Sequence, residues 1–217
     1  MRFRIDLKIF LIAIIYFFTN QIQIYVLMMI FALIHEFGHL IAGILLKMKP
    51  KKLEIILTGV SISFKTDIKD INKKIGKGNM LNIKKLIVAI AGPLTNILII
   101  AIVLKMPLNM IKQLNIIYAN LVILIFNLIP IYPLDGGRII KELLNIKFGR
   151  KKSIRYMDIL SILDTIILSI IGVMITMLNN NIAIIIIILY IWILVLKEHK
   201  ITKQKIVMYK SLEKFTY

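Results

Sequence analysis

The stretch FALIHEFGHL, residues 31–40, holds two histidines and a glutamate in an otherwise apolar run. His35 and His39 are four residues apart, so on a helix they share one face and both can reach a single metal ion. Glu36 projects beside them, where it can act on a metal-bound water. Neutral imidazole suits zinc, and a catalytic zinc site keeps three protein ligands and one open position. The motif therefore predicts two ligands of a zinc site with a carboxylate next to them.

The surroundings of the motif favour a metal site over two histidines that only pack between helices. The run is apolar enough to cross a membrane, where ionisable side chains are costly and usually functional. The sequence has three histidines, two of them in the motif, and no cysteine, so a further ligand must be His, Asp or Glu. Gly38 allows another helix to approach closely. At 1.5 Å per residue, His39 would lie about 10 Å below the cytoplasmic end of its span, so the site would open to the cytoplasm.

Asp135, in FNLIPIYPLDGGRII (126–140), is the best candidate for the third ligand. We expect it to end the fourth membrane span on the cytoplasmic side, near the depth of the two histidines. Pro130 and Pro133 interrupt the helix, and the two glycines after Asp135 allow unusual backbone angles. Broken backbone at membrane depth is tolerated where it lines a protein cavity. Considered alone, Asp135 is interpreted as a carboxylate at a helix end near the membrane interface. Because His35 and His39 provide only two ligands, its interpretation as the third ligand is the stronger one.

Four other polar residues in or near apolar runs have interpretations of their own. Asn127 needs partners if it is buried, so it either packs structurally or bonds the backbone of a substrate. Asn96, in the segment AGPLTN, is expected to follow a helix break that opens the third span and to make an interhelical hydrogen bond. Asp164 is expected to have an interfacial role at the start of the fifth span. His199, in the basic tail, is expected to have no function.

The composition indicates that the protein is embedded in a lipid bilayer. The 217 residues are 59% hydrophobic, the mean hydropathy is +0.86, and such long apolar runs are typical of a protein with several membrane spans. The net charge is +18, but all except two of the 29 Lys and Arg residues lie in segments 1–8, 47–85, 138–155 and 197–217. The positive-inside rule assigns these segments to the cytoplasm. A basic face against anionic lipid explains the charge, and no nucleic acid is expected as a partner.

These patterns predict an all-α polytopic membrane protein with about six transmembrane helices and both termini in the cytoplasm. The predicted spans lie near 9–19, 22–46, 86–104, 114–134, 158–178 and 182–196. No small-residue cleavage site follows the first apolar stretch, so we interpret it as a retained span and not as a signal peptide. Residues 1–196 would form one domain, and residues 197–217 a basic cytoplasmic tail.

The segment after the second span is expected to contain a small β-hairpin at the membrane surface. VSISFKT (60–66) alternates apolar and polar residues with a period of two, and LEIIL (53–57) precedes it. The predicted hairpin covers about residues 53–66, and a charged, glycine-punctuated connection follows it. It is either a plain solvated hairpin or an edge that pairs with an extended peptide.

Three motifs, in this order, resemble the signature of the site-2 protease family of intramembrane zinc metalloproteases. They are HEFGH in the second span, AGPLTN in the third and NLIPIYPLDGGR at the end of the fourth. Their order and spacing resemble the sporulation branch, typified by stage IV sporulation protein FB, over about residues 1–200. The resemblance implies zinc ligation by His35, His39 and Asp135, a general base in Glu36, and substrate positioning by Asn127 and Pro133.

The resemblance also implies an activity and a setting. The enzyme would hydrolyse a peptide bond in or near the bacterial cytoplasmic membrane, on its cytoplasmic side. In the sporulation branch the substrate is a pro-sigma factor of the mother cell, the membrane is the one around the forespore, and inhibitory membrane partner proteins hold the protease inactive. Proteases of that branch carry a carboxy-terminal CBS domain, which is not expected after residue 196 of this sequence.

Several alternatives remain open at this point. A site-2-type protease of another substrate would cut remnant signal peptides or an anti-sigma factor, although no PDZ domain of the anti-sigma branch is expected here. A metal transporter often shows an inverted repeat and has no use for a general base, and neither feature suits this sequence. A non-catalytic membrane metal-binding protein would usually lack a ligand or the base, whereas His35, Glu36, His39 and Asp135 are all present.

Overall fold

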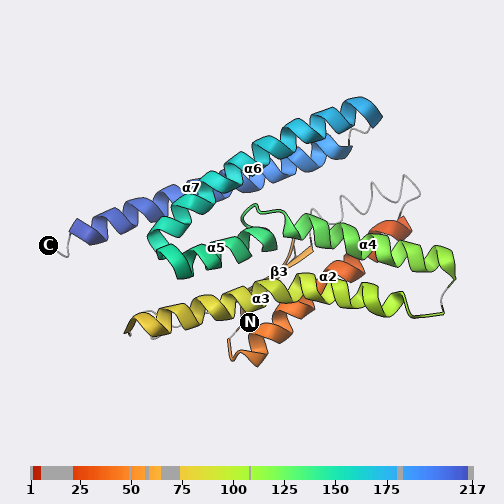
Figure 1. Cartoon of the computed structure of the whole chain (residues 1–217), viewed down its shortest axis with the longest axis horizontal. Coiled ribbons are helices and arrows are strands. Elements are labelled where there is room, and N and C mark those ends of the chain that lie inside the picture. The colour runs from red at the N-terminus through yellow and green to blue at the C-terminus, as the bar shows by residue number, and fades with distance from the viewer. Residues whose placement is uncertain are drawn as a thin grey trace. The chain divides into compact units, whose positions relative to one another are not determined.

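Helices dominate the computed structural model of the chain, which describes residues 2–5, 22–48, 50–56, 59–64, 74–107, 109–179 and 183–214. Within these ranges there are six helices, shown in Figure 1. They are α2 (Ile22–Leu45), α3 (Lys74–Val103), α4 (Met110–Leu128), α5 (Asp135–Phe148), α6 (Arg150–Asn179) and α7 (Ala183–Lys214). Among the described elements, α2 packs against α3, and α6 packs against both α5 and α7.

Three short strands accompany the helices: β1 (Arg2–Ile5), β2 (Pro50–Ile56) and β3 (Gly59–Phe64). β2 and β3 pair antiparallel, with Leu53 opposite Ile62 and Ile56 opposite Gly59, so strands lie where the sequence predicts a hairpin. β1 pairs parallel with β2, which makes a sheet of order β1-β2-β3. The parallel partner was not predicted, because a strand so distant in sequence leaves no local signal.

The second predicted span is a helix whose carboxyl end has a defined cap. Leu45 is the last residue of α2, and Lys47 has a φ of 58°, in the left-handed region. The Lys47 N–H donates to the Ile44 carbonyl at 2.9 Å, and the Met48 N–H donates to the Gly43 carbonyl at 2.9 Å. This pair of bonds is the Schellman arrangement, which satisfies carbonyls that the helix leaves without partners.

Four described helices are long and apolar enough to cross a membrane: Ile22–Leu45, Asn79–Val103, Met110–Leu128 and Arg150–Leu178. They correspond to the second to fifth predicted spans. The predicted span at 9–19 lies outside the described residues. The predicted span at 182–196 lies in α7 but is not among the four, because the charged residues from Lys197 onward follow its apolar part closely. The described residues therefore do not support the predicted count of six.

Two predicted boundaries are wrong. The third span was expected from residue 86, after a connection, but α3 begins at Lys74 and continues through Pro93 without a break. The fourth span was expected to end at Asp135, but α4 ends at Leu128 and Asp135 begins a separate helix, α5. The break comes early because Pro130 and Pro133 cannot donate the hydrogen bonds that would extend α4.

The distribution of burial is the reverse of that in a water-soluble protein. Large apolar side chains on the long helices are exposed, for example Leu45 (76%) and Leu178 (81%), whereas Asn96, Asn120 and Thr165 are 0% exposed. Continuous apolar surface of this kind suits contact with lipid, while polar groups must find partners inside the protein. The apolar helices thus indicate an integral membrane protein.

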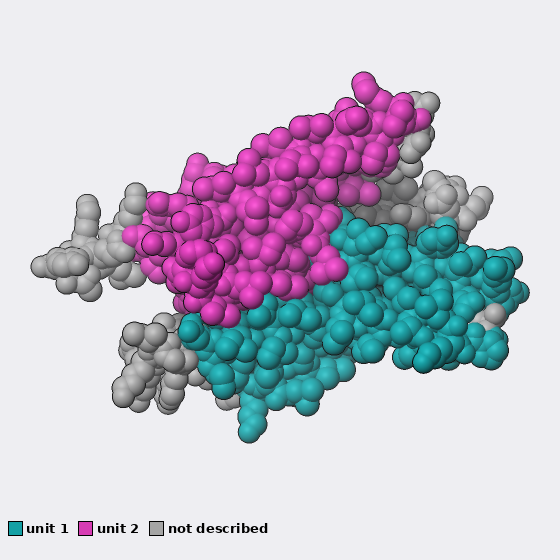
Figure 2. Space-filling view, viewed as in Figure 1, with its two compact units in different colours: residues 1–127 teal, residues 128–217 magenta. Residues whose placement is uncertain are grey.

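The chain divides into two compact units, Met1–Asn127 and Leu128–Tyr217, which are coloured separately in Figure 2. The first unit contains the sheet, α2, α3 and nearly all of α4, and the second contains α5, α6 and α7. The predicted single domain over residues 1–196 stays a prediction.

Candidate metal centre

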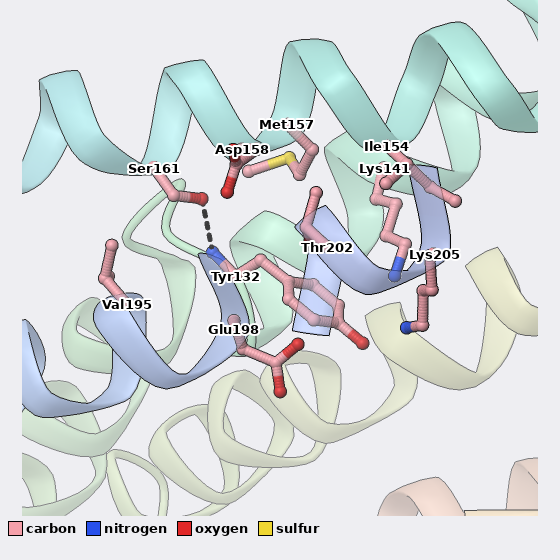
Figure 3. Close-up of a pocket in the computed structure, with 10 residues that line it drawn as sticks. All are labelled: Tyr132, Lys141, Ile154, Met157, Asp158, Ser161, Val195, Glu198, Thr202 and Lys205. Atoms are coloured by element: carbon pink, nitrogen blue, oxygen red, sulfur yellow. Dashed lines mark hydrogen bonds between the residues drawn. The ribbon is translucent and has the colours of Figure 1, made fainter. Parts of the chain in front are cut away.

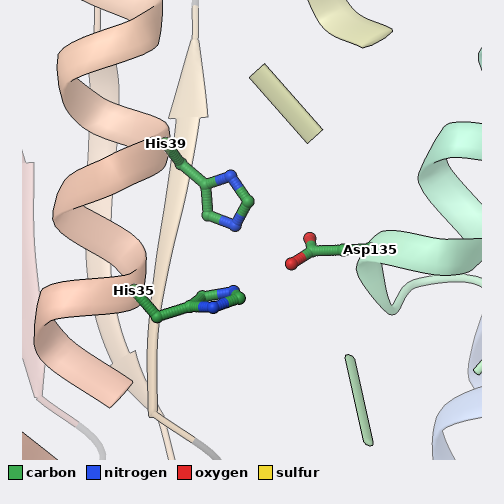
Figure 4. Close-up of side chains that lie close together, drawn as sticks. All are labelled: His35, His39 and Asp135. Carbon is green, nitrogen blue, oxygen red and sulfur yellow. The ribbon is translucent and has the colours of Figure 1, made fainter. Parts of the chain in front are cut away.

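The two histidines of the HEFGH motif lie on the buried face of α2, as the helical spacing predicts. Each of the two residues is only 2% exposed. The centroids of their imidazole rings are 4.9 Å apart, and the angle between the ring planes is 84°. Glu36 lies between them in sequence and is half-buried. Because His35 and His39 are one turn apart, their imidazoles project from neighbouring positions on the same side of the helix (Figure 4).

The orientation of His39 is fixed by a backbone carbonyl of α3. Nδ1 of His39 lies 2.6 Å from the carbonyl oxygen of Val88. Since a carbonyl oxygen only accepts, Nδ1 must carry the hydrogen and donate it, which leaves the lone pair on Nε2. A metal-binding histidine almost always has its second nitrogen held in this way. His39 is therefore held in the tautomer that a metal ion requires at Nε2.

Gly92 of α3 provides the space in front of the two imidazoles. A Cβ at Gly92 would lie 2.6 Å from Nε2 of His35 and would overlap Nε2 and Cε1 of His39. Both Nε2 atoms therefore face the same small region, which only a residue without a side chain leaves open. The helix break predicted in AGPLTN, the segment that contains Gly92 and Pro93, is wrong, because both residues lie inside α3.

A second close contact between α2 and α3 brings the histidine face up to Gly92. A Cβ at Gly38 would overlap Oγ1 of Thr95 and lie 3.0 Å from the Ala91 carbonyl oxygen. The Thr95 hydroxyl lies 2.8 Å from the Ala91 carbonyl oxygen and 2.7 Å from that of Gly92. Gly38 thus has the role that the sequence predicts, which is to allow a helix to approach closely.

Asp135 is the first residue of α5 and is 4% exposed. A carboxylate is favourable in the first turn of a helix, where the backbone N–H groups give a partial positive charge. Arg138, one turn later, donates from Nη1 to Oδ1 of Asp135 at 3.3 Å. This ion pair helps to fix the orientation of the carboxylate.

The two glycines after Asp135 act through space and not through unusual backbone angles. Both are helical, and the positive φ among the described glycines belongs to Gly149. A Cβ at Gly136 would overlap the Leu128 carbonyl oxygen, and a Cβ at Gly137 would overlap the backbone of Ile131. The pair therefore lets the start of α5 fold back against the end of α4 and the segment that follows it.

The predicted substrate-positioning residues lie close to this turn in sequence. Asn127 is half-buried near the end of α4, and its Nδ2 donates to the Ile123 carbonyl of the same helix at 3.1 Å. Pro133 is half-buried and follows a cis peptide bond from Tyr132. Nothing described here assigns a substrate contact to either residue, so both remain predictions.

The remaining polar residues have mixed outcomes. Asn96 donates to the Asn120 carbonyl on α4 at 3.5 Å, which confirms the predicted interhelical hydrogen bond. Asp164 lies within α6. Nδ1 of His199 lies 2.8 Å from a carboxylate oxygen of Asp158, so the side chain joins α7 to α6; the expectation that it has no role in the site stays a prediction.

His35 and His39 each offer an imidazole nitrogen, and Asp135 offers a carboxylate oxygen, which are donor types that a metal ion accepts. Figure 4 shows these three side chains. Two residues that bear on the group were missed by sequence reasoning, Val88 and Gly92. Val88 acts through its backbone, which leaves no sequence signal. Gly92 is a small residue in an apolar helix, and that signal was read as a helix break.

Comparison with known proteins gives one family match over part of the chain and one match of fold. The sequence profile of Peptidase family M50 matches residues 104–171, which include Asn127, Pro133 and Asp135 but not the HEFGH motif. The solved structure of the Site-2 Protease from Methanocaldococcus jannaschii has the same fold, with a TM-score of 0.66 and 21% sequence identity over 92% of each chain. No curated protein matches the sequence. The family match supports a metalloprotease, and the apolar helices indicate that it resides in a membrane.

Proposed function

We propose that the chain is an intramembrane zinc metalloprotease that hydrolyses a peptide bond in or near the membrane at its cytoplasmic side. The observation that carries this proposal is the pair of buried histidines on an apolar helix, with both Nε2 atoms facing the space left by Gly92. Two ionisable side chains at membrane depth cost free energy, so side chains of this kind usually have a function. Glu36, next to His35 in the same helix, adds the general base that a transporter or a scaffold does not need.

The zinc ligands in this proposal are His35, His39 and Asp135. The donor set fits zinc, which accepts imidazole nitrogen and carboxylate oxygen and keeps one position open in catalytic sites. The hydrogen bond from His39 to the Val88 carbonyl leaves Nε2 as the metal-binding nitrogen, and the pairing with Arg138 helps to orient the Asp135 carboxylate. When bound, the zinc supplies Lewis-acid polarisation of the scissile carbonyl and makes a water acidic enough to attack it.

The residues of the chain supply proton transfer and positioning. Glu36 takes a proton from the attacking water and later gives it to the leaving amine, which is general base and then general acid catalysis. Asn127 and Pro133 hold the backbone of the substrate near the scissile bond. A membrane helix hides its carbonyls in hydrogen bonds, so the substrate must first become extended at this point.

The strands are proposed to hold the extended substrate. β3 is an outer strand of the described sheet, so its free edge can pair with one more strand. Six spans with both termini in the cytoplasm remain the proposed topology. It sets β2 and β3, which follow the second span, on the cytoplasmic side of the membrane. Proline substitutions at alternate positions of 60–64 should lower cleavage, and unchanged cleavage by folded protein would count against strand pairing.

We propose that the substrate is a pro-sigma factor processed during sporulation, in the membrane around the forespore, with inhibitory membrane proteins as further partners. The motif order HEFGH, AGPLTN and NLIPIYPLDGGR supports this branch of the site-2 proteases. Remnant signal peptides and an anti-sigma factor are the substrates to test next.

The experiment is co-expression of the chain with a candidate pro-sigma factor, comparing the wild type with Glu36→Gln. This substitution keeps the size of the side chain and removes the base. Shortening of the substrate by the wild type alone would support both the chemistry and the sporulation substrate. If neither protein shortens it, the sporulation substrate is wrong, and the same pair is tested on signal-peptide remnants. Equal cleavage by both proteins would refute the role of Glu36.

A further inference from the structure

The segment between α4 and α5, residues 129–134, is where the chain departs from helical geometry just before Asp135. Two backbone hydrogen bonds lie within it. The Ile131 N–H donates to the Ile129 carbonyl at 2.7 Å, and the Leu134 N–H donates to the Ile131 carbonyl at 2.8 Å. Pro130 and Pro133 have no N–H to donate. The position of this segment must therefore depend on contacts with other elements.

The N–H of Tyr132 finds its acceptor on α6. It donates to the hydroxyl oxygen of Ser161 at 3.0 Å, across 29 residues of sequence (Figure 3). Ser161 is 4% exposed, and its own carbonyl accepts a hydrogen bond from the Thr165 hydroxyl at 2.7 Å. Loss of this acceptor would cost the hydrogen bond that holds the Tyr132 backbone to α6.

The side chain of Tyr132 is held as well. Nζ of Lys141, on α5, lies 3.7 Å from the centre of the Tyr132 ring, a cation–π contact. The Lys141 carbonyl in turn accepts a hydrogen bond from the hydroxyl of Ser153, a residue of α6 that is 0% exposed, at 2.9 Å. In Figure 3 the Tyr132 ring lies in a small pocket that α7 also lines, through Glu198 and other residues. Two buried serines of α6 thus fix the segment before α5 and the middle of α5.

We infer that Ser161 is a positioning residue of the proposed protease: it fixes the backbone at Tyr132 and thereby sets Pro133 and Asp135. This inference rests on the proposed function only for its effect on catalysis. Its structural part, the hold of Ser161 on the segment 129–134, stands on the hydrogen bond itself. Asp135 follows Tyr132 by three residues. Movement of the Tyr132 backbone would therefore displace Pro133 and the Asp135 carboxylate.

The matched test compares Ser161→Ala with Ser169→Ala. Ser169 lies on the same helix, its hydroxyl donates to the Thr165 carbonyl at 2.7 Å, and it accepts from Nε1 of Trp192 at 2.9 Å. Both substitutions remove one hydroxyl from α6 and leave one N–H donor without its acceptor, but only Ser161→Ala affects the segment before Asp135. Ser161→Thr keeps the hydroxyl and serves as the rescue variant.

Hydrogen–deuterium exchange of residues 129–134 is measured first, because it needs no substrate. In Ser161→Ala the Tyr132 amide should exchange roughly tenfold faster than in the wild type, the loss expected for one net hydrogen bond. Ser169→Ala and Ser161→Thr should exchange like the wild type. Equal rates in Ser161→Ala and Ser169→Ala would overturn the inference.

Kinetics on the cleaved substrate complete the test. In Ser161→Ala kcat should fall about tenfold, with KM changed less than twofold and zinc content equal to that of the wild type, while Ser161→Thr restores kcat. A fall in kcat that Ser169→Ala shares, or faster exchange with unchanged kcat, would overturn the positioning role. A wild type that cleaves no substrate would refute the proposed function instead, and the exchange comparison would still decide whether Ser161 holds the segment.

Discussion

Substitution of Gly92 by alanine should abolish zinc binding with little change in the rest of the fold. The added Cβ would stand 2.6 Å from Nε2 of His35 and overlap the His39 ring, whereas ordinary contacts begin at 3.4 Å. The rings would have to retreat by about 0.8 Å or more. Zinc–nitrogen bonds are about 2.0–2.1 Å long, and a workable site tolerates only about 0.2 Å of error.

A displacement several times larger than this tolerance removes at least one ligand. The zinc affinity should therefore fall by more than about 100-fold, beyond the usual effect of changing a residue behind a ligand. The assay is zinc content of the purified protein in detergent, followed by competition titration against a chelator. Circular dichroism and thermal unfolding check that the variant is folded.

Gly172→Ala is the matched control for this experiment. Gly172 also lies inside an apolar helix, and its added Cβ would meet the far end of the Ile188 side chain, which can rotate away. It should bind zinc like the wild type. If Gly92→Ala, shown to be folded, bound zinc as tightly as Gly172→Ala, the histidines would not share the region in front of Gly92 as ligands of one metal ion.

Three further predictions concern the same chain. Glu36→Gln should lower the cleavage rate by at least about 100-fold and leave the zinc content unchanged, since it removes the base and no ligand; loss of zinc in this variant would contradict the assignment. Asp135→Ala should lose both zinc and activity, and chelation of the wild type should do the same reversibly, with zinc addition restoring cleavage only in the wild type. His199→Ala should lower the free energy of unfolding by about 1 kcal/mol or less, because the pair with Asp158 is partly exposed at 29% and 16%; a loss of several kcal/mol in thermal or denaturant unfolding would contradict this.

The shared face of the two histidines could be predicted from the sequence, whereas the bounds of several helices could not. His35 and His39 could be paired because helical spacing alone sets them on one face, and the buried face of α2 confirms this. Asp135 could be selected because thiolates are absent and carboxylates at membrane depth are rare. Its placement at the end of α4 was wrong, since periodicity does not show where a proline stops one helix and the next begins.

The contacts that position the site residues could not be predicted from the sequence, for a different reason. The Val88 carbonyl and the Ser161 hydroxyl act across 49 and 29 residues of sequence, and neither residue type is distinctive. Gly92 looked like a helix breaker because it precedes a proline, but it is an interior residue whose missing side chain is what matters. Long-range packing decides such roles, and a single sequence carries no direct record of it.

Many polar side chains in the long helices hydrogen-bond to the backbone of their own helix. Among the described residues, six donate to the carbonyl four residues earlier, at distances of 2.7–3.1 Å: Thr95, Asn120, Asn127, Thr165, Ser169 and Thr176. Inside a bilayer, such a bond gives the hydroxyl or amide an acceptor on its own helix, so fewer donors depend on a neighbour. Others do depend on one: Nε1 of Trp192 in α7 donates to the Ser169 oxygen of α6, and Asn96 of α3 donates to the Asn120 carbonyl of α4. Helix contacts in this chain therefore have to supply acceptors for only a part of the buried polar groups.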